Sequence, residues 1–222
     1  ARIEEFPDLL HPNDLGYAKW AAGLRPVFAT LGLMETGPDD FRIEKDYVPL
    51  FNGKNLNGWG FKVTPPRKPN KNGIVFSVFP EPENFYGKTV SSDGRYAAIN
   101  GRLVVTTPTE GRRIQQLWTT RDFPNDFTLK LEFRATPNAD SGVFLRSKQL
   151  QCRDFPLAGP YKDLKKYKPQ DWNELVIKVK GNIAHCTCNG EVLEAEYEIP
   201  DTGAIGLEGD RGQMEYRRIR IR

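Results

Sequence analysis

From residue 48 to the end of the chain, hydrophobic and polar residues alternate in short runs. The clearest run is 127–133, where Phe127, Leu129, Leu131 and Phe133 take every second position and polar residues lie between them. Successive side chains of a β-strand point to opposite faces, so this pattern predicts a strand with one face in a core and the other in solvent. Similar runs predict further strands at 102–107, 115–120, 142–147, 173–181, 183–189, 203–209 and 214–222.

Turn and bulge signals connect these runs. Asn189-Gly190 predicts a tight hairpin turn. In the last run the hydrophobic positions change parity between Tyr216 and Ile219, which predicts a β-bulge near residues 217–218. The 20 glycines and 17 prolines favour many turns and short elements. Together these signals predict an all-β sandwich of two antiparallel sheets.

The N-terminal part of the chain has a different pattern. Residues 14–33 are rich in Ala and Leu and predict one helix, with Asp14 as its N-cap. A polar connector follows, so we divide the chain into a helical extension at 1–40 and a β domain at 41–222. Residues 61–95 contain five prolines and predict a long surface loop that could cover a site.

Composition and charge exclude several classes of function. Lys and Arg exceed Asp and Glu by only three, which gives no electrostatic argument for a nucleic-acid or membrane partner. No apolar run approaches the roughly 18 residues that span a bilayer. The three cysteines do not have the spacing of a zinc site, and no phosphate-binding loop occurs. We predict no cofactor, although the many Glu and Asp oxygens would suit a hard divalent cation such as calcium.

The segment at 8–13, Asp-Leu-Leu-His-Pro-Asn, followed by Gly16, Tyr17 and Trp20, resembles the last conserved block of the SGNH (GDSL-type) hydrolases. The resemblance implies that Asp8 and His11 belong to a Ser-His-Asp triad, in which Asp orients the His that acts on the serine. The serine and the rest of such a domain would precede Ala1. We therefore expect an upstream SGNH domain as a partner in the same chain and an incomplete triad here.

The β region resembles the 3-keto-disaccharide hydrolase family. The segments that carry this resemblance are LFNGKNLNGW (50–59), SSDGRYAAINGRLVV (91–105), DFTLKLEFRATPNADSGVFLR (126–146), DWNELVIKVKG (171–181), NGE (189–191) and AIGLEGDRGQMEYRRIRIR (204–222). The resemblance implies a concanavalin A-like jelly-roll sandwich that acts on sugars oxidised at carbon 3 and is extracellular or periplasmic. A position that is commonly acidic in the family is Gln149 in this chain.

A ketone at carbon 3 acidifies the hydrogen on carbon 2, so a carboxylate base can remove it while an acid protonates the departing glycosidic oxygen. Such a site also needs a group that stabilises the enolate and an aromatic platform for the sugar. On the polar faces of the predicted strands, we assign the catalytic roles to Glu132 and Asp154. Candidate substrate-binding residues are Arg134, Arg146, Gln151, Arg153, Trp118 and Glu208.

Each candidate also has a structural interpretation. Glu132 and Arg134 share one strand face and could simply form ion pairs on an exposed sheet, and Asp154 could be a turn residue. The leading hypothesis is a glycoside hydrolase or lyase, and its rival is a carbohydrate-binding module attached to an SGNH esterase. A third alternative is an interaction domain without a ligand. The proposed site requires Glu132, Arg146 and Asp154 to converge in one cleft.

Overall fold

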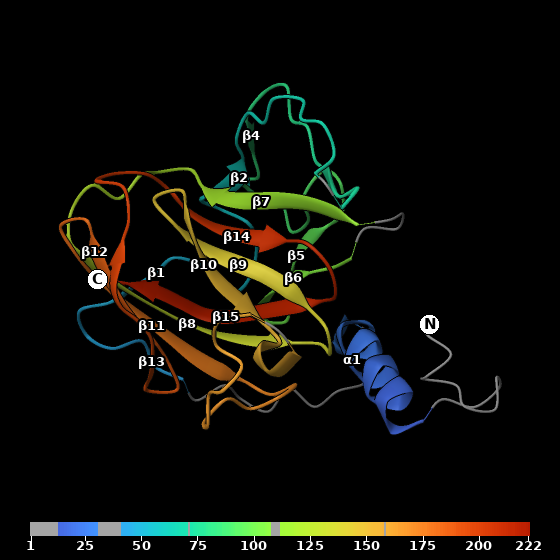
Figure 1. The fold of residues 1–222 in the computed structure, drawn as a ribbon. Coiled ribbons are helices and arrows are strands. Elements are labelled where there is room, and N and C mark those ends of the chain that lie inside the picture. Colours follow the sequence, from blue (N-terminus) through green and yellow to red (C-terminus); the bar gives the residue numbers. More distant parts are fainter. Residues whose placement is uncertain (1–12, 31–40, 71, 108–111, 158) are drawn as a thin grey trace.

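The computed structural model describes residues 13–30, 41–70, 72–107, 112–157 and 159–222, and it shows two packed β-sheets (Figure 1). Sheet A contains, in order, β13 (Glu191–Glu198), β12 (Ile183–Cys188), β11 (Asn173–Lys180), β8 (Phe127–Ala135), β15 (Met214–Ile221), β6 (Arg102–Val105) and β5 (Tyr96–Ile99), with β1 (Val48–Pro49) beside β15. Sheet B contains β10 (Lys148–Arg153), β9 (Asp140–Leu145), β14 (Ile205–Gly209), β7 (Arg113–Thr119), β2 (Trp59–Phe61) and β4 (Glu83–Asn84). These pairings are antiparallel, whereas the two-residue strand β3 (Val75–Phe76) runs parallel to β7. The predicted all-β sandwich is confirmed.

The core lies between the two sheets and is built from the hydrophobic positions of the alternating runs. On sheet A, Leu129 and Leu131 of β8 are fully buried, and on sheet B so are Leu117, Val143 and Leu207. Burying one such side chain contributes about 1.5–3 kcal/mol, so the facing rows hold the sheets together. The alternate residues of every strand therefore face outward, and the outer faces are where polar groups gather.

The bulge and the hairpin lie where the pattern predicts them. The register between β15 and β8 shifts between Arg217 and Arg220, and Arg218 has a φ of 52°. Asn189 and Gly190 have φ values of 48° and 81°, as a tight turn between β12 and β13 requires. The bulge returns the hydrophobic side chains of the last strand to the core, which explains their change of parity.

The predicted helix is α1 (Asp14–Thr30), which lies beside the sandwich in Figure 1. Its N-cap is Asn13 rather than Asp14, because Asn13 Oδ1 accepts a hydrogen bond from Gly16 N at 3.0 Å. The expected extension to residue 33 lies outside the described residues. Among the described helices, none combines the length and hydropathy needed to cross a membrane. The division at residue 40 stays a prediction.

Arg146, one of the predicted substrate-binding residues, instead joins loops at one end of the sandwich. Its side chain is buried, and Nε donates to Phe123 O at 2.6 Å. Nη2 donates to Asn125 O at 2.7 Å, and Nη1 donates to Gly181 O at 2.7 Å and Pro200 O at 3.2 Å. A guanidinium whose donors are all directed at main-chain carbonyls has a structural role, so the substrate-binding prediction for Arg146 is corrected.

We expect Arg146→Ala to lower the free energy of unfolding by about 3 kcal/mol or more, because four main-chain carbonyl groups would lose their donor. Urea unfolding followed by tryptophan fluorescence measures this loss. The exposed Arg42 offers a matched control, and Arg42→Ala should leave the midpoint unchanged. Equal stability of the two variants would contradict the role assigned to Arg146.

Candidate functional site

A cavity of about 570 Å³ lies on the outer face of sheet B, and we call it the sheet B cavity. Its lining comes from the outward positions of four adjacent strands and from the loop between β2 and β5. The lining residues are Gln149 and Gln151 of β10, Asp140 and Phe144 of β9, Glu208 and Asp210 at β14, Ile114, Gln116 and Trp118 of β7, together with Ser147, Arg67 and Phe76. Arg67 and Phe76 belong to the proline-rich segment, which therefore borders the cavity as the sequence predicts.

Glu208 lines this cavity and is only 6% exposed. Its Oε2 accepts a hydrogen bond from Gln116 Nε2 at 2.9 Å, and its Oε1 accepts one from Gln149 Nε2 at 2.8 Å. Burial raises the pKa of Glu208 to about 7, against the lowering effect of the two carboxamides, while the charges of Asp210 and Asp140 raise it further. A carboxyl group with a pKa near neutrality can both accept and return a proton.

Two glycines let large side chains lie close to the sheet in this cavity. A Cβ atom on Gly142 would lie 2.6 Å from Gln149 Nε2, so Gln149 can cross β9 toward Glu208 only because residue 142 has no side chain. A Cβ atom on Gly206 would lie 2.7 Å from Trp118 Cε3, so the indole covers β14 at this point. The Trp118 ring also meets Phe144 edge-on, with centroids 5.3 Å apart.

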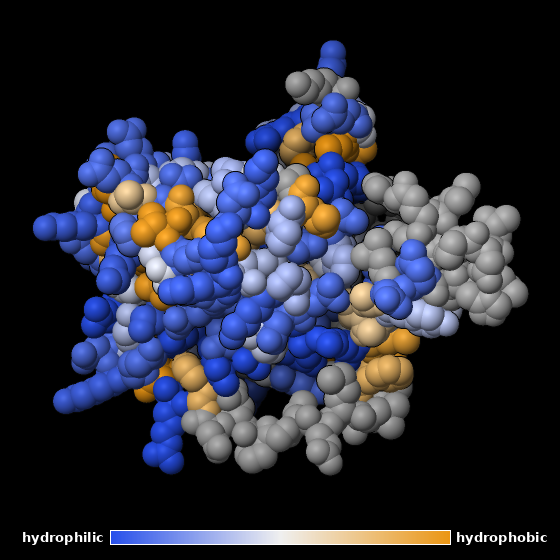
Figure 2. Space-filling model, turned by 60° about the horizontal axis from the view of Figure 1, so that its bottom comes forward, coloured by the Kyte–Doolittle hydropathy of each residue, from blue (hydrophilic) through white to orange (hydrophobic). Residues whose placement is uncertain are grey.

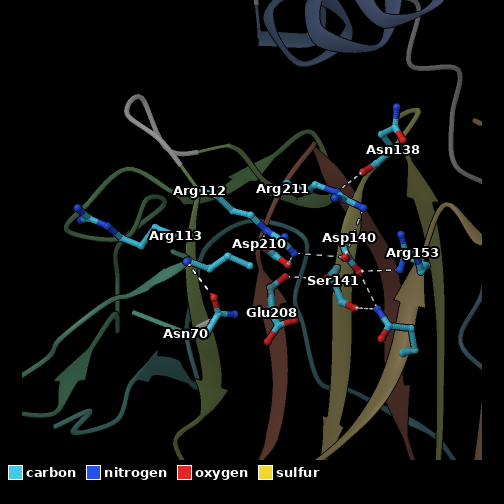
Figure 3. A network of polar contacts seen from close by, with 12 residues as sticks. Asn70, Arg112, Arg113, Asn138, Asp140, Ser141, Arg153, Glu208, Asp210 and Arg211 are labelled. Carbon is cyan, nitrogen blue, oxygen red and sulfur yellow. Dashed lines mark hydrogen bonds and ion pairs between the residues drawn. The ribbon is translucent and has the colours of Figure 1, made fainter. Parts of the chain in front are cut away.

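The two aspartates of the cavity lie in an ion-pair network with arginines (Figure 3). Arg112 donates two hydrogen bonds to the Asp210 carboxylate, and its Nη2 lies 3.4 Å from Asp140 Oδ2. Gln151 Nε2 donates to Asp140 Oδ1 at 2.7 Å, and Arg153 Nη1 lies 3.5 Å from the same oxygen. Arginines thus lie beside Asp140 and Asp210, whereas neutral carboxamides bind the Glu208 carboxyl group and burial raises its pKa.

The predicted site residues divide between the two sheets. Gln151, Trp118 and Glu208 line the sheet B cavity, and Arg153 reaches it through Asp140. Gln116, Asp140 and Asp210 also line the cavity and were not among the predicted residues. The alternation of side chains along a strand could have identified two of them. Gln116 lies two positions before Trp118, and Asp210 lies two positions after Glu208, so each shares an outward face with a predicted residue.

Glu132 and Arg134 lie on the outer face of sheet A, away from the cavity. Glu132 accepts hydrogen bonds from Arg217 Nε and Arg218 Nη1, both at 2.6 Å. Arg134 pairs with Glu215, and its guanidinium carbon lies 4.7 Å from the Trp172 ring centroid. Figure 2 brings forward the side of Figure 1 that carries β8, β11 and β15, and its surface is mostly hydrophilic.

Asp154 directly follows β10. The alternation of that strand directs its side chain to the inner face, whereas Gln151 and Arg153 point outward. Its Oδ2 accepts a hydrogen bond from Asn138 N at 3.1 Å, and its Oδ1 accepts one from Tyr167 Oη at 3.4 Å. Burial raises the pKa of Asp154, but the side chain does not line the sheet B cavity. The expected convergence of Glu132, Arg146 and Asp154 in one cleft is therefore wrong. Both sheets have polar outer faces, and the alternation alone does not distinguish them.

Two further predictions concern a metal ion and the triad remnant. Within the described part of the chain, no group of three or more His, Cys, Asp or Glu side chains could hold a metal ion. Arg112 lies between the Asp140 and Asp210 carboxylates, so we assign no residue to a calcium ion. Asp8 and His11 lie outside the described residues, and the SGNH resemblance stays a prediction.

Comparisons with known proteins find a matching family and several similar structures. The sequence profile of the 3-keto-alpha-glucoside-1,2-lyase-like domain matches residues 46–222. A structure described as a "putative glycosyl hydrolase" from Parabacteroides distasonis is similar with a TM-score of 0.54 and 14% identity, covering 81% of this chain and 97% of that one. A second such structure from the same organism has a TM-score of 0.46 and 20% identity, covering 57% and 89%. The carbohydrate-binding module CBM66 from Bacillus subtilis has a TM-score of 0.38 and 8% identity, covering 75% and 96%. No curated protein sequence matches the chain.

The raised pKa of Glu208 makes stability depend on pH. Its pKa is about 7 in the folded chain against an ordinary value of 4.5, so between these values the folded state holds a proton that the unfolded state releases. The free energy of unfolding contributed by this group is therefore present below about pH 4.5 and falls as pH rises to about 7. Glu208→Gln has no such titration. We expect the stability of this variant relative to the parent to increase by up to about 3 kcal/mol across that window, measured by urea unfolding at several pH values. Parallel pH profiles would contradict the assigned pKa.

Proposed function

The chain belongs to the family of 3-keto-alpha-glucoside-1,2-lyase-like domains, which supports a carbohydrate-active function, and we propose that it cleaves glycosidic bonds of 3-keto-sugars in the sheet B cavity. The observation that carries this proposal is Glu208, a buried carboxyl group with a pKa of about 7 that lines a cavity large enough for a sugar. Proton transfer is most efficient when the pKa of the transferring group lies near the working pH.

The proposed reaction is an elimination followed by hydration. Glu208 takes the proton from carbon 2 of the 3-keto ring, and the electron pair of that C–H bond passes into an enolate on the carbon 3 oxygen. The enolate then forms the double bond between carbons 1 and 2 as the glycosidic C–O bond breaks. Glu208 returns its proton to the departing oxygen. Addition of water across the double bond completes a net hydrolysis, and no oxidant or reductant is consumed.

Several neighbours suit this chemistry. Asp140 and Asp210 are bound to Arg112, so neither is as well suited as Glu208 to exchange a proton. The carboxamides of Gln116 and Gln149 and the guanidinium of Arg112 supply hydrogen-bond donors beside the carboxylates, which suits stabilisation of an enolate oxygen. Trp118 supplies an aromatic surface for the sugar ring.

A carbohydrate-binding module is the second candidate function. It is favoured by Trp118, whose indole lies over Gly206 and lines the cavity, since aromatic surfaces of this kind bind sugars without chemistry. The extracellular or periplasmic location that the resemblance implies is part of both proposals. The two functions differ in whether bound sugar is converted.

We expect Glu208→Gln to lower kcat for a 3-keto-glucoside by about 10²–10⁴, the usual contribution of a proton-transferring group. Glu132→Gln serves as the matched control, because Glu132 binds Arg217 and Arg218 on the other sheet, and kcat should stay within about twofold of the parent. Product formation by chromatography and circular dichroism of each variant are measured together. Loss of turnover in Glu132→Gln alone would contradict the site, and sugar binding without turnover would identify a binding module.

The pH dependence of the reaction provides an independent test. If Glu208 acts as the base, it must be ionised in the free enzyme, so kcat/KM should rise with pH and level off above about 7. Initial rates at low substrate concentration between pH 5 and 9 give this profile. A rate that is independent of pH across this range would argue against Glu208 as the base.

A further inference from the structure

One end of the sheet B cavity, where β7 begins, carries more positive than negative charge. We call it the arginine end, after the four arginines that lie in or beside it: Arg67, Arg112, Arg153 and Arg211. We propose that the arginine end binds an anionic substituent at carbon 6 of the reacting sugar ring, so that the substrate is an acidic sugar. This inference rests on the proposed function for the position of that ring.

Arg67 lines the cavity and keeps its hydrogen-bond donors available. In the described part of the chain it has no ion pair and no hydrogen bond, and its guanidinium carbon lies 5.7 Å from the Phe76 ring centroid. Phe76 pairs with Ile114 of β7, two positions after Arg112, so Arg67 and Arg112 belong to the same end of the cavity. A guanidinium has five N–H donors and stays charged at any pH of interest. Arg67 can therefore bind an anion without giving up an existing partner.

Arg153 is a second arginine without a full set of acceptors, and unlike Arg67 it is buried, with 7% of its surface exposed. Its Nη1 lies 3.5 Å from Asp140 Oδ1, which is longer than an ordinary N–H···O hydrogen bond. Its Nε is buried with no hydrogen-bond partner among the described residues. Because burial of a charged donor without an acceptor is unfavourable, an anion beside Arg153 would be bound favourably.

The aspartates of the cavity do not compensate all of this charge. Arg112 takes up both oxygens of Asp210. Asp140 is then shared by three arginines that lie around it in Figure 3, with Arg112 Nη2 and Arg211 Nη2 at 3.4 and 3.6 Å from Oδ2 and Arg153 beside Oδ1. Four arginines against two aspartates leave an excess of two positive charges, and one remains when Glu208 is ionised.

The geometry of a sugar ring directs its carbon 6 substituent to one of the two ends of the cavity. Glu208 acts at carbon 2, and carbon 5, which carries carbon 6, lies opposite carbon 2 in a six-membered sugar ring. Asp210 follows Glu208 by two positions, about 7 Å along a strand, which is comparable to the reach across one ring. Two positions before Glu208, the Trp118 ring lies over Gly206 and against Phe144, so that end is aromatic. An anionic substituent therefore points to the arginine end.

The test compares the methyl 3-keto-glycosides of glucuronic acid and of glucose, which differ at carbon 6 alone. We expect the parent protein to have the higher kcat/KM for the acidic sugar. Arg67→Ala should lower kcat/KM for the acidic sugar roughly tenfold more than for the neutral one, because a charge-assisted hydrogen bond is lost. Arg67→Lys keeps the charge and should retain part of the preference. The preference should also fall as salt is added, since salt screens exposed charges.

Lys68→Ala is the matched control, because Lys68 is the next residue of the same segment, is exposed and does not line the cavity. The ratio of the two kcat/KM values should be that of the parent. Equal or faster conversion of the neutral sugar by the parent, or an unchanged ratio in Arg67→Ala, would overturn the anion site and leave the proposed function intact. The 6-sulfate of methyl 3-keto-glucoside identifies the source of the anion: faster conversion than the glucuronide assigns a sulfated sugar, and slower conversion assigns a uronic acid.

A binding measurement separates failure of the anion site from failure of the proposed function. If the parent converts none of these substrates, the proposed function is wrong, and binding of unoxidised methyl glucuronide and methyl glucoside is measured by isothermal titration calorimetry. Tighter binding of the glucuronide to the parent, with loss of this difference in Arg67→Ala, would support the anion site by itself. Equal affinity for the two sugars, or binding of neither, would overturn it.

Discussion

The site on sheet B depends on the close approach of two side chains to the sheet at positions that have no side chain of their own. Gln149 crosses Gly142 to reach Glu208, and Trp118 covers Gly206. A methyl group at either glycine would come within 2.7 Å of the side chain above it, closer than packed atoms allow. Without these glycines the carboxylate would lose a donor and the cavity would lose its aromatic surface in the observed position.

The same sheet gives three carboxylates two different environments. Asp140 and Asp210 lie at the Arg112 end of the cavity, where the guanidinium compensates their charge. Glu208 lies two positions before Asp210 in the sequence, and there two neutral carboxamides bind its carboxyl group and burial raises its pKa. Carboxylates in one cavity thus have different partners: two lie beside a guanidinium, and the third is bound by neutral carboxamides and has its pKa raised by burial.

The arginine-rich outer face of sheet A has the composition of a site but a different arrangement. Glu132 binds Arg217 and Arg218, and Trp172 lies against Arg217 with 4.0 Å between the guanidinium carbon and the ring centroid. Glu132 and Glu215 each pair with arginines of neighbouring strands, and such cross-strand pairs stabilise an exposed sheet. Sheet A therefore contributes its inner face to the core and leaves sheet B to bear the cavity.

Much of this fold could be predicted from the sequence, because hydrophobic alternation reports directly on which side chains enter a core. The strand at 127–133, the Asn189-Gly190 turn and the bulge at 217–218 are local signals that the structure confirms. The same alternation placed Trp118 and Glu208 on outward positions. The alternation could not decide whether Glu132 or Glu208 belongs to the candidate site, because both occupy polar positions on strands with alternating residues. Only the order of the strands, which brings β10, β9, β14 and β7 together, decided which polar face surrounds a cavity, because that order depends on contacts between residues far apart in the chain.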